Sequence, residues 1–160
     1  MKAVETLEEW LVKELTKRNA SITTAESCTG GLLSGRIVNA SGASAVFSQS
    51  FVTYSNEAKN RLLGVKQETL DSVGAVSEET AMQMAVGAAR AAGAEVALST
   101  TGVAGPDGGT PEKPVGLVYI GCVCFDKTVV EKHLFQGNRM EVREASVEAA
   151  LILAKKCLEE

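Results

Sequence analysis

The segment from residue 23 to residue 31 gathers side chains that can carry out chemistry. It reads Thr23-Thr-Ala-Glu-Ser-Cys-Thr-Gly-Gly31, so four hydroxyls and one thiol fall within nine residues. We interpret it as a strand end leading into a helix start, where unpaired N–H groups and the helix dipole favour an anion or an oxyanion. Ser27 or Thr29 could instead simply cap the helix, but a cap explains only one hydroxyl. Ser27 and Cys28 are therefore candidate nucleophiles.

A second segment, Phe51-Val-Thr-Tyr-Ser-Asn-Glu-Ala-Lys59, supplies a candidate base. Tyr54 lies at a predicted strand end, and Lys59 lies in the first turns of the next predicted helix, where the dipole disfavours a cation. If Lys59 is partly buried beside other hydrogen-bond donors, its pKa falls and its amine can accept a proton. The alternative is a solvated surface lysine beside Glu57, and the spacing alone does not exclude it.

A third segment is a long loop over residues 100–114. It contains four glycines and three prolines directly after a predicted strand. This composition imposes a specific backbone shape and often brings the main chain close to a ligand. The glycine spacing matches neither a dinucleotide fingerprint nor a Walker-type phosphate loop. Taken alone, the loop could also be a connector.

Other catalytic devices lack their residues. The single histidine, His133, falls in a predicted strand, so a Ser-His-Asp or Cys-His arrangement would depend on one poorly placed residue. The contiguous motifs Ser-x-x-Lys and Gly-x-Ser-x-Gly do not occur. The four cysteines have no metal-ligand spacing, and Cys122 and Cys124 alternate on one strand face, which favours core residues. What remains is a serine or cysteine nucleophile with a lysine base distant in sequence.

The composition limits the class of protein. The chain has 160 residues, 45% hydrophobic and 22% charged, which predicts one globular domain over residues 1–160. Its formal charge of −4 argues against nucleic acid and anionic membranes as partners. The best uncharged apolar run, residues 115–125, is too short to cross a bilayer, and the acidic amino terminus has no apolar signal core. We therefore expect a cytoplasmic protein with reduced thiols.

Hydrophobic periodicity and capping residues place these segments on alternating helices and strands. Predicted helices cover residues 4–18, 32–39, 56–63, 78–92 and about 138–158, with a further turn over 67–72. Predicted strands cover residues 21–25, 46–54, 95–101, 115–125 and 128–135. Because helices and strands alternate first and a hairpin follows, we expect an α/β fold, a single-domain three-layer αβα sandwich with a mixed central sheet.

Four strings along the chain resemble one known family. They are Thr24-Ala-Glu-Ser-Cys-Thr-Gly-Gly31, Phe51-Val-Thr-Tyr-Ser-Asn-Glu-Ala-Lys59, Gly74-Ala-Val-Ser-Glu78, and Gly102-Val-Ala-Gly-Pro-Asp-Gly-Gly109 followed by Glu112-Lys-Pro-Val-Gly116. They closely resemble the CinA carboxy-terminal domain family, and the resemblance covers about residues 5–158. The chain is similar to the stand-alone form, which lacks the larger amino-terminal domain of some members.

The resemblance implies an activity. Enzymatic members are nicotinamide-nucleotide amidases (NMN deamidases), which hydrolyse nicotinamide mononucleotide to nicotinic acid mononucleotide and ammonia without a metal or cofactor. The resemblance also implies an αβα sandwich, usually assembled as a homo-oligomer. By position, Ser27 would be the nucleophile, with Lys59 as base and Tyr54 relaying the proton or holding Lys59. Lys59 must then have a pKa about three units below its reference value near 10.4.

Further residues are expected to bind the substrate. The N–H groups of residues 28–31 are candidate oxyanion donors. The glycine loop and an arginine at the start of the last helix are candidates for the 5′-phosphate, with Arg143 as an alternative to Arg139. Cys28 also stays a rival nucleophile, because a thiolate at a helix start has a lowered pKa. The predicted substrate-binding residues are Cys28, Thr29, Gly30, Gly31, Thr101, Gly102, Gly105 and Arg139.

Two other functions stay open at this point. One is a non-catalytic regulatory or partner-binding domain of the competence-damage-inducible type. The other is an amidase for a different nucleotide-like carboxamide, since the four strings indicate the type of reaction more specifically than they indicate the ring of the substrate. The presence of Ser27, Tyr54 and Lys59 together favours the amidase.

Overall fold

A mixed five-stranded sheet forms the centre of the molecule. The computed structural model describes residues 3–160. The strands are β1 (Ile22–Glu26), β2 (Phe51–Val52), β3 (Val96–Gly102), β4 (Leu117–Cys124) and β5 (Lys127–Leu134). They lie in the order β2-β1-β3-β4-β5, where β1 is parallel to β2 and β3, and β4 is antiparallel to β3 and β5. The expected mixed sheet and its closing hairpin are confirmed.

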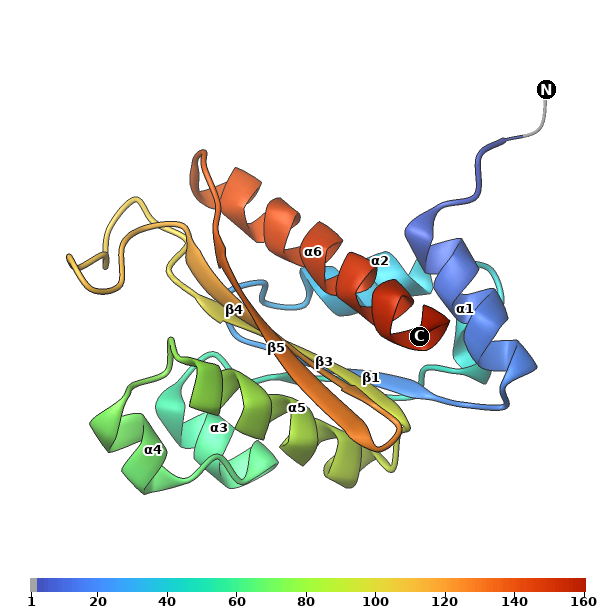
Figure 1. Cartoon of the computed structure of the whole chain (residues 1–160), viewed down its shortest axis with the longest axis horizontal. Coiled ribbons are helices and arrows are strands. Elements are labelled where there is room, and N and C mark those ends of the chain that lie inside the picture. The colour runs from blue at the N-terminus through green and yellow to red at the C-terminus, as the bar shows by residue number, and fades with distance from the viewer. Residues whose placement is uncertain (1–2) are drawn as a thin grey trace.

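Helices cover both faces of this sheet, as Figure 1 shows. They are α1 (Leu7–Lys17), α2 (Leu32–Val38), α3 (Asn56–Leu63), α4 (Gln67–Ser72), α5 (Glu78–Ala92) and α6 (Arg139–Glu159), with a short 3-10 helix at Ala43–Ala45. α1, α2 and α6 pack on one face, and α3, α4 and α5 lie on the other. The three-layer αβα sandwich expected from the sequence is confirmed.

Local signals set the helix boundaries. Ser55 and Ser77 accept hydrogen bonds from the N–H groups of Ala58 and Thr80, and so begin α3 and α5. Gly64 and Gly93 end the same two helices in the left-handed conformation, which glycine adopts without a steric penalty. These boundaries agree with the sequence-based prediction because the caps depend on nearby residues alone.

Two apolar cores fill the space between the layers. The larger core joins α1, α2 and α6 to one sheet face through buried residues such as Leu11, Leu33 and Leu151. It also contains Cys122 and Cys124 as buried free thiols, which confirms them as core residues. The smaller core lies beneath α5 and includes Met84. Because helices cover both faces of the sheet, a site has to form at the edge where β1 and β3 end.

The strand predicted over residues 46–54 is wrong for most of its length. Only Phe51 and Val52 form β2, while Val46 ends the 3-10 helix and Phe47 makes a single bridge with Ile22. The backbone carbonyl of Gln49 accepts from the hydroxyl of a β1 threonine instead of a strand neighbour. At Gln49 a side-chain hydrogen bond therefore takes the place of a bond between strands, which the alternation of apolar residues does not reveal.

Over residues 3–160, no helix is both long enough and apolar enough to span a lipid bilayer.

Candidate active site

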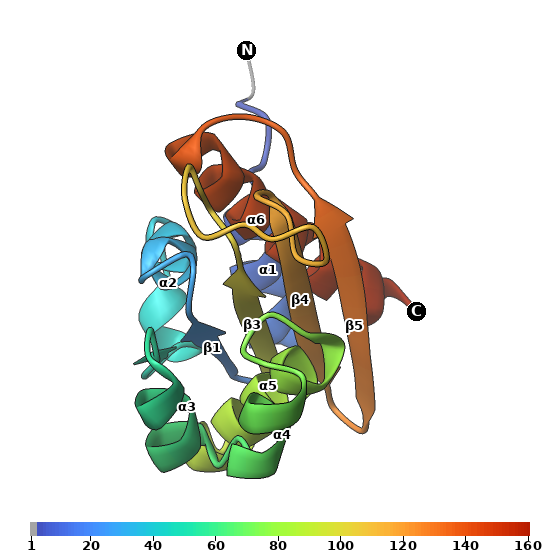
Figure 2. The ribbon, with the colours of Figure 1, turned by 90° about the vertical axis from the view of Figure 1, so that its left-hand side faces the viewer.

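Three chain segments meet where the parallel strands end. β1 runs parallel to β2 and β3, so the carboxyl ends of all three lie at one edge of the sheet. The N–H of Ser27 donates to the carbonyl of Thr100 at 2.9 Å, and the N–H of Thr53 donates to the carbonyl of Glu26 at 2.9 Å. These two bonds hold the segment after β1 against β3 on one side and against β2 on the other. Figure 2 shows β1 and β3 side by side.

A cavity of about 310 Å³ opens at this edge. It is lined by residues from all three segments and from the start of α6, among them Ser27, Tyr54, Lys59, Gly102, Gly105 and Arg139. With Cys28 and Thr101, which also line the cavity, the structure brings together eight predicted site residues from separate places in the sequence. The volume of this cavity is at the lower end of the range for small-molecule sites.

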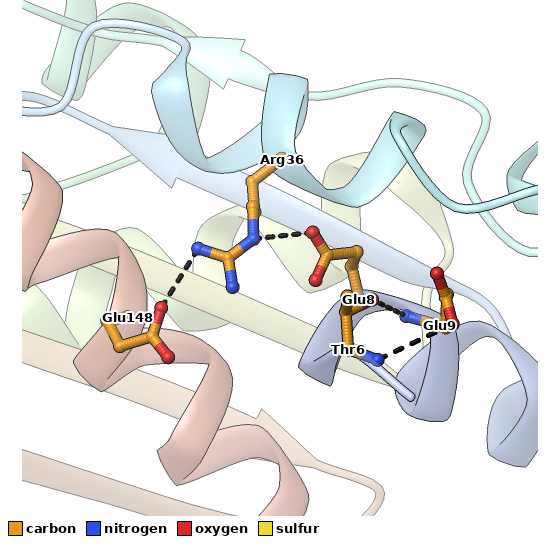
Figure 3. A network of polar contacts seen from close by, with 5 residues as sticks. All are labelled: Thr6, Glu8, Glu9, Arg36 and Glu148. Carbon is orange, nitrogen blue, oxygen red and sulfur yellow. Dashed lines mark hydrogen bonds and ion pairs between the residues drawn. The ribbon is translucent and has the colours of Figure 1, made fainter. Parts of the chain in front are cut away.

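A groove of similar size, about 330 Å³, lies between α2 and α6 and offers different chemistry. Its Arg36 donates to Glu8 at 2.5 Å and to Glu148 at 2.9 Å (Figure 3). Burial of Glu8 opposes its ionisation, but the hydrogen bond from Arg36 holds the pKa of this carboxyl below its usual value. Among the described residues that line this groove, none carries a hydroxyl or a thiol. The described lining of the groove therefore offers no hydroxyl or thiol nucleophile.

Lys59 is buried against the hydroxyl of Ser27. Its side chain is 1% exposed, and its Nζ lies 2.9 Å from Ser27 Oγ, 2.9 Å from the carbonyl oxygen of Thr53 and 3.4 Å from that of Tyr54. Burial lowers the pKa of Lys59 to about 8. A neutral amine fits these neighbours, because two N–H bonds can face the carbonyls while the lone pair accepts the Ser27 proton. The alternative of a solvated surface lysine is wrong.

Tyr54 does not contact this pair with its phenol. The residue is 63% exposed, and its hydroxyl accepts from Arg139 Nη2 at 3.1 Å. Arg139 Nη1 also donates to the carbonyl of Gly105 at 2.7 Å. Of the two roles expected for Tyr54, holding Lys59 is met by its backbone carbonyl, which lies 3.4 Å from Nζ, whereas its side chain joins Arg139 at the cavity.

Three of the predicted substrate-binding residues lie in the loop after Ser27 and do not line the cavity. Glu26 accepts from the N–H of Gly31 at 3.1 Å, and the N–H of Gly30 donates to the carbonyl of Ser27 at 3.2 Å. The hydroxyl of Thr29 is bound to Glu26 at 2.7 Å. None of Thr29, Gly30 and Gly31 lines the cavity. Both glycines have positive φ angles, 57° and 108°, so the turn itself requires them.

The start of α2 is consequently closed to a substrate anion. Beside Gly31, Glu26 also accepts from the N–H groups of Leu33 and Ser34, each at 2.9 Å. Over residues 3–160, no backbone carbonyl accepts from the N–H groups of Cys28 and Thr29. Of these two residues only Cys28 lines the cavity, so its N–H, directly after Ser27, is the candidate oxyanion donor in place of the whole stretch 28–31.

Cys28 lines the cavity but has the properties of an unreactive thiol. Its side chain is 6% exposed, and burial raises the pKa of the thiol to about 11. A reactive cysteine needs a lowered pKa, because the thiolate is the nucleophile. The environment therefore favours Ser27 over Cys28.

The two candidate arginines have separate positions. Arg143 donates from Nε to the carbonyl of Cys28 and from Nη2 to that of Thr29, both at 3.0 Å, and so braces the loop. Arg139 lines the cavity, whereas Arg143 does not. The geometry thus favours Arg139 as the group that faces an anionic ligand.

The glycine loop owes its shape to close packing. A Cβ on Gly105 would lie 2.4 Å from Val115 Cγ1, and one on Gly102 would lie 2.6 Å from the carbonyl oxygen of Leu117. Thr101 also lines the cavity, and its hydroxyl donates to the carbonyl of Ala75 at 2.8 Å. The loop is therefore fixed in place beside the nucleophile.

Sequence reasoning missed some residues of the site. Glu26 was not assigned a role, although a carboxylate in a predicted buried strand directly before the nucleophile was the available signal. Asn56 and Asp107 also line the cavity, and both fall within strings already quoted. Over residues 3–160, no group of three or more His, Cys, Asp or Glu residues is placed to hold a metal ion.

Comparison with known proteins identifies the family of this chain. Residues 4–158 match the CinA C-terminal domain. The chain belongs to the CinA family. A CinA-like protein from Kosmotoga olearia is 53% identical over 154 residues, which cover 96% of this chain and 37% of that protein. This domain therefore spans less than half the length of that relative.

Solved structures show the same fold over the whole domain. The competence/damage inducible protein CihA from Agrobacterium tumefaciens is 40% identical, with a TM-score of 0.93 and complete coverage of both chains. A CinA superfamily protein from Escherichia coli is 33% identical with a TM-score of 0.91, covering 98% of this chain and 90% of that one. The CinA-family fold is thus established for this chain.

Proposed function

We propose that this CinA-family domain is an amidohydrolase that converts nicotinamide mononucleotide to nicotinic acid mononucleotide and ammonia. The observation that carries the proposal is the buried Lys59 amine 2.9 Å from Ser27 Oγ, with a pKa lowered to about 8. A serine hydroxyl is a weak nucleophile until a base takes its proton, and a buried neutral lysine is such a base. The family resemblance supports the carboxamide as substrate.

The reaction follows from this geometry. Neutral Lys59 takes the Ser27 proton as Oγ bonds to the carboxamide carbon, and the N–H group of Cys28 stabilises the oxyanion. The Lys59 ammonium then gives its proton to the amide nitrogen, the C–N bond breaks, and ammonia leaves an ester on Ser27. Water attacks this ester while Lys59 takes a water proton and returns it to Oγ. The products are the carboxylic acid and free enzyme.

The cavity also provides for the phosphate of the substrate. Arg139 faces the cavity with a guanidinium that is bound only to a neutral carbonyl and a phenol among the described residues. Such a group binds phosphate by charge-assisted hydrogen bonds. We assign the phosphate to Arg139 and the adjoining glycine loop, and the pyridine ring to the space beside Ser27.

Ammonia release from nicotinamide mononucleotide tests the proposal directly. The purified protein is incubated with this substrate and a metal chelator, and ammonia and the product acid are quantified by mass spectrometry. Nicotinamide riboside, which lacks the phosphate, is the matched control. It loses one charge-assisted contact of roughly 1.5–3 kcal/mol, so its KM should be about 10- to 100-fold higher.

Each outcome of this assay separates the functions considered. No release from folded protein would reject the amidase and leave a regulatory or partner-binding domain. Equal KM values for the two substrates would reject Arg139 as the phosphate ligand. Release from an unrelated nucleotide carboxamide, but not from nicotinamide mononucleotide, would keep the chemistry and change the substrate.

The pKa of Lys59 predicts how the rate depends on pH. The base is active when neutral, so kcat should rise about tenfold per pH unit up to about pH 8 and then level off. Between pH 6 and the plateau the expected change is about 100-fold. The measurement uses saturating substrate, because the substrate phosphate itself titrates near pH 6. A flat profile, or a rate that falls through pH 8, would contradict Lys59 as the base.

The resemblance also implies a homo-oligomer, and we propose this assembly for the chain. Sedimentation velocity of the purified domain measures it. A single species at the monomer mass of 16.8 kDa across micromolar concentrations would reject it.

A further inference from the structure

The carboxylate of Glu26 is a buried acceptor for six hydrogen bonds. The residue is fully buried, and each of its two oxygens accepts three bonds. Oε1 binds the hydroxyl of Thr29 and the N–H groups of Gly31 and Leu33, at 2.7, 3.1 and 2.9 Å. Oε2 binds the hydroxyls of Thr24 and Ser34 and the N–H of Ser34, at 3.1, 2.8 and 2.9 Å. All six partners donate, which suits the acceptor-only carboxylate.

These bonds hold the segment that carries the nucleophile. Because the single hydroxyl proton of Thr29 goes to Glu26, Thr29 Oγ1 accepts from the Thr100 hydroxyl at 2.7 Å. The carbonyl of Thr100 in turn accepts the N–H of Ser27. Glu26 therefore closes a ring of hydrogen bonds around Ser27, which joins β1, β3 and the start of α2.

The same residue also supports the base. The backbone carbonyl of Glu26 accepts the N–H of Thr53 at 2.9 Å, and the carbonyl of Thr53 accepts from Lys59 Nζ at 2.9 Å. Glu26 thus supports both Ser27 and Lys59, whose Oγ and Nζ atoms lie 2.9 Å apart. Its own side chain is bonded to neither of these two atoms.

We propose that Glu26 is a positioning residue whose carboxylate fixes the Ser27–Cys28–Thr29 turn, so that Ser27 Oγ faces Lys59 and the N–H group of Cys28 faces the oxyanion. The inference rests on the proposed function and adds a residue to its machinery. A carboxylate placed in this way also occupies the start of α2, so the dipole of that helix stabilises Glu26 in place of a substrate anion.

Glu26→Gln tests the proposal with a change of almost no volume. Whichever way the amide is turned, its NH2 group replaces an oxygen that accepted from three donors. A hydroxyl among them can reverse and accept, but at least one backbone N–H loses its acceptor: those of Gly31 and Leu33 in one orientation, that of Ser34 in the other. Misplacing oxyanion donors costs on the order of 100-fold in rate, so kcat should fall about 100-fold while KM changes less than about threefold. Turnover is measured well below the melting temperature of the variant, so that loss of folded protein does not contribute.

Glu8→Gln is the matched control. Glu8 is also a buried glutamate, 6% exposed and paired with Arg36, but it lies in the ion cluster of Figure 3 away from the cavity. We expect this variant to lose thermal stability and keep kcat within about twofold. An unchanged kcat in folded Glu26→Gln, or an equal fall of kcat in Glu8→Gln, would overturn the positioning role.

A second readout keeps this test independent of the substrate. Phenylmethylsulfonyl fluoride reacts with an activated serine by forming an Oγ–S bond and releasing fluoride, and mass spectrometry gives the labelling rate of Ser27. The rate should fall at least about tenfold in Glu26→Gln and stay unchanged in Glu8→Gln. If the wild type does not hydrolyse nicotinamide mononucleotide, the proposed function fails, and the labelling rate still decides whether Glu26 positions Ser27.

Thr29→Val provides a variant for the case in which Glu26→Gln does not fold. It removes the hydroxyl between Glu26 and Thr100 and keeps the side-chain volume. We expect kcat and the Ser27 labelling rate to fall about tenfold, with KM nearly constant. Wild-type values for both would overturn the proposal.

Discussion

Lys59→Met should lower kcat for ammonia release by about 10³- to 10⁴-fold. Methionine fills a similar volume but cannot accept the Ser27 proton or protonate the leaving nitrogen, and general acid–base catalysis contributes up to about 10⁴-fold. The carbonyls of Thr53 and Tyr54 lose their Nζ donor, which lowers the stability of the fold. This loss is offset because the variant no longer has to bury an amine away from water. We expect a folded protein whose melting temperature lies within a few degrees of the wild type.

The measurement is steady-state turnover with thermal unfolding of the same sample. Lys17→Met on the exposed surface of α1 is the control for removing a lysine, and it should retain full activity. Turnover above a tenth of the wild-type rate in folded Lys59→Met would show that another group serves as base.

Ser27→Ala should abolish turnover, with a loss of about 10⁴-fold or more. The variant lacks the oxygen that forms the acyl intermediate, so only binding and oxyanion stabilisation remain. Removing one hydroxyl at a site that is 9% exposed leaves the packing intact, because the Ser27 backbone bond to Thr100 does not depend on the side chain. Trapping of the acyl intermediate by hydroxylamine in the wild type, and its absence in the variant, checks the assignment independently of rate.

Cys28→Ser is the matched change at the neighbouring position. The buried thiol has a pKa raised to about 11, so its loss should leave kcat within about threefold of the wild type. The opposite pattern, with activity kept in Ser27→Ala and lost in Cys28→Ser, would make Cys28 the nucleophile and contradict the proposed mechanism.

Elements fixed by nearby residues are predictable from the sequence. The helix beginning after Ser77 and ending at Gly93 follows from a hydroxyl cap and a left-handed glycine, both within one turn of the boundary. The strand expected over residues 46–54 forms only at Phe51–Val52, and the carbonyl of Gln49 is bonded by a side chain from β1, a contact between residues far apart along the chain. Local periodicity carries no information about such a partner.

The candidate site divides in the same way. Residue types and family resemblance alone brought forward Ser27, Lys59 and Arg139, and they also placed the glycine loop after a strand. The tertiary structure decided that Lys59 is buried, that the Tyr54 phenol lies on Arg139, and that Glu26 rather than a substrate occupies the start of α2. The physical reason is that desolvation and hydrogen-bond partnership depend on which groups the sheet brings within 3 Å or so of each other, whereas a sequence determines only which groups are available.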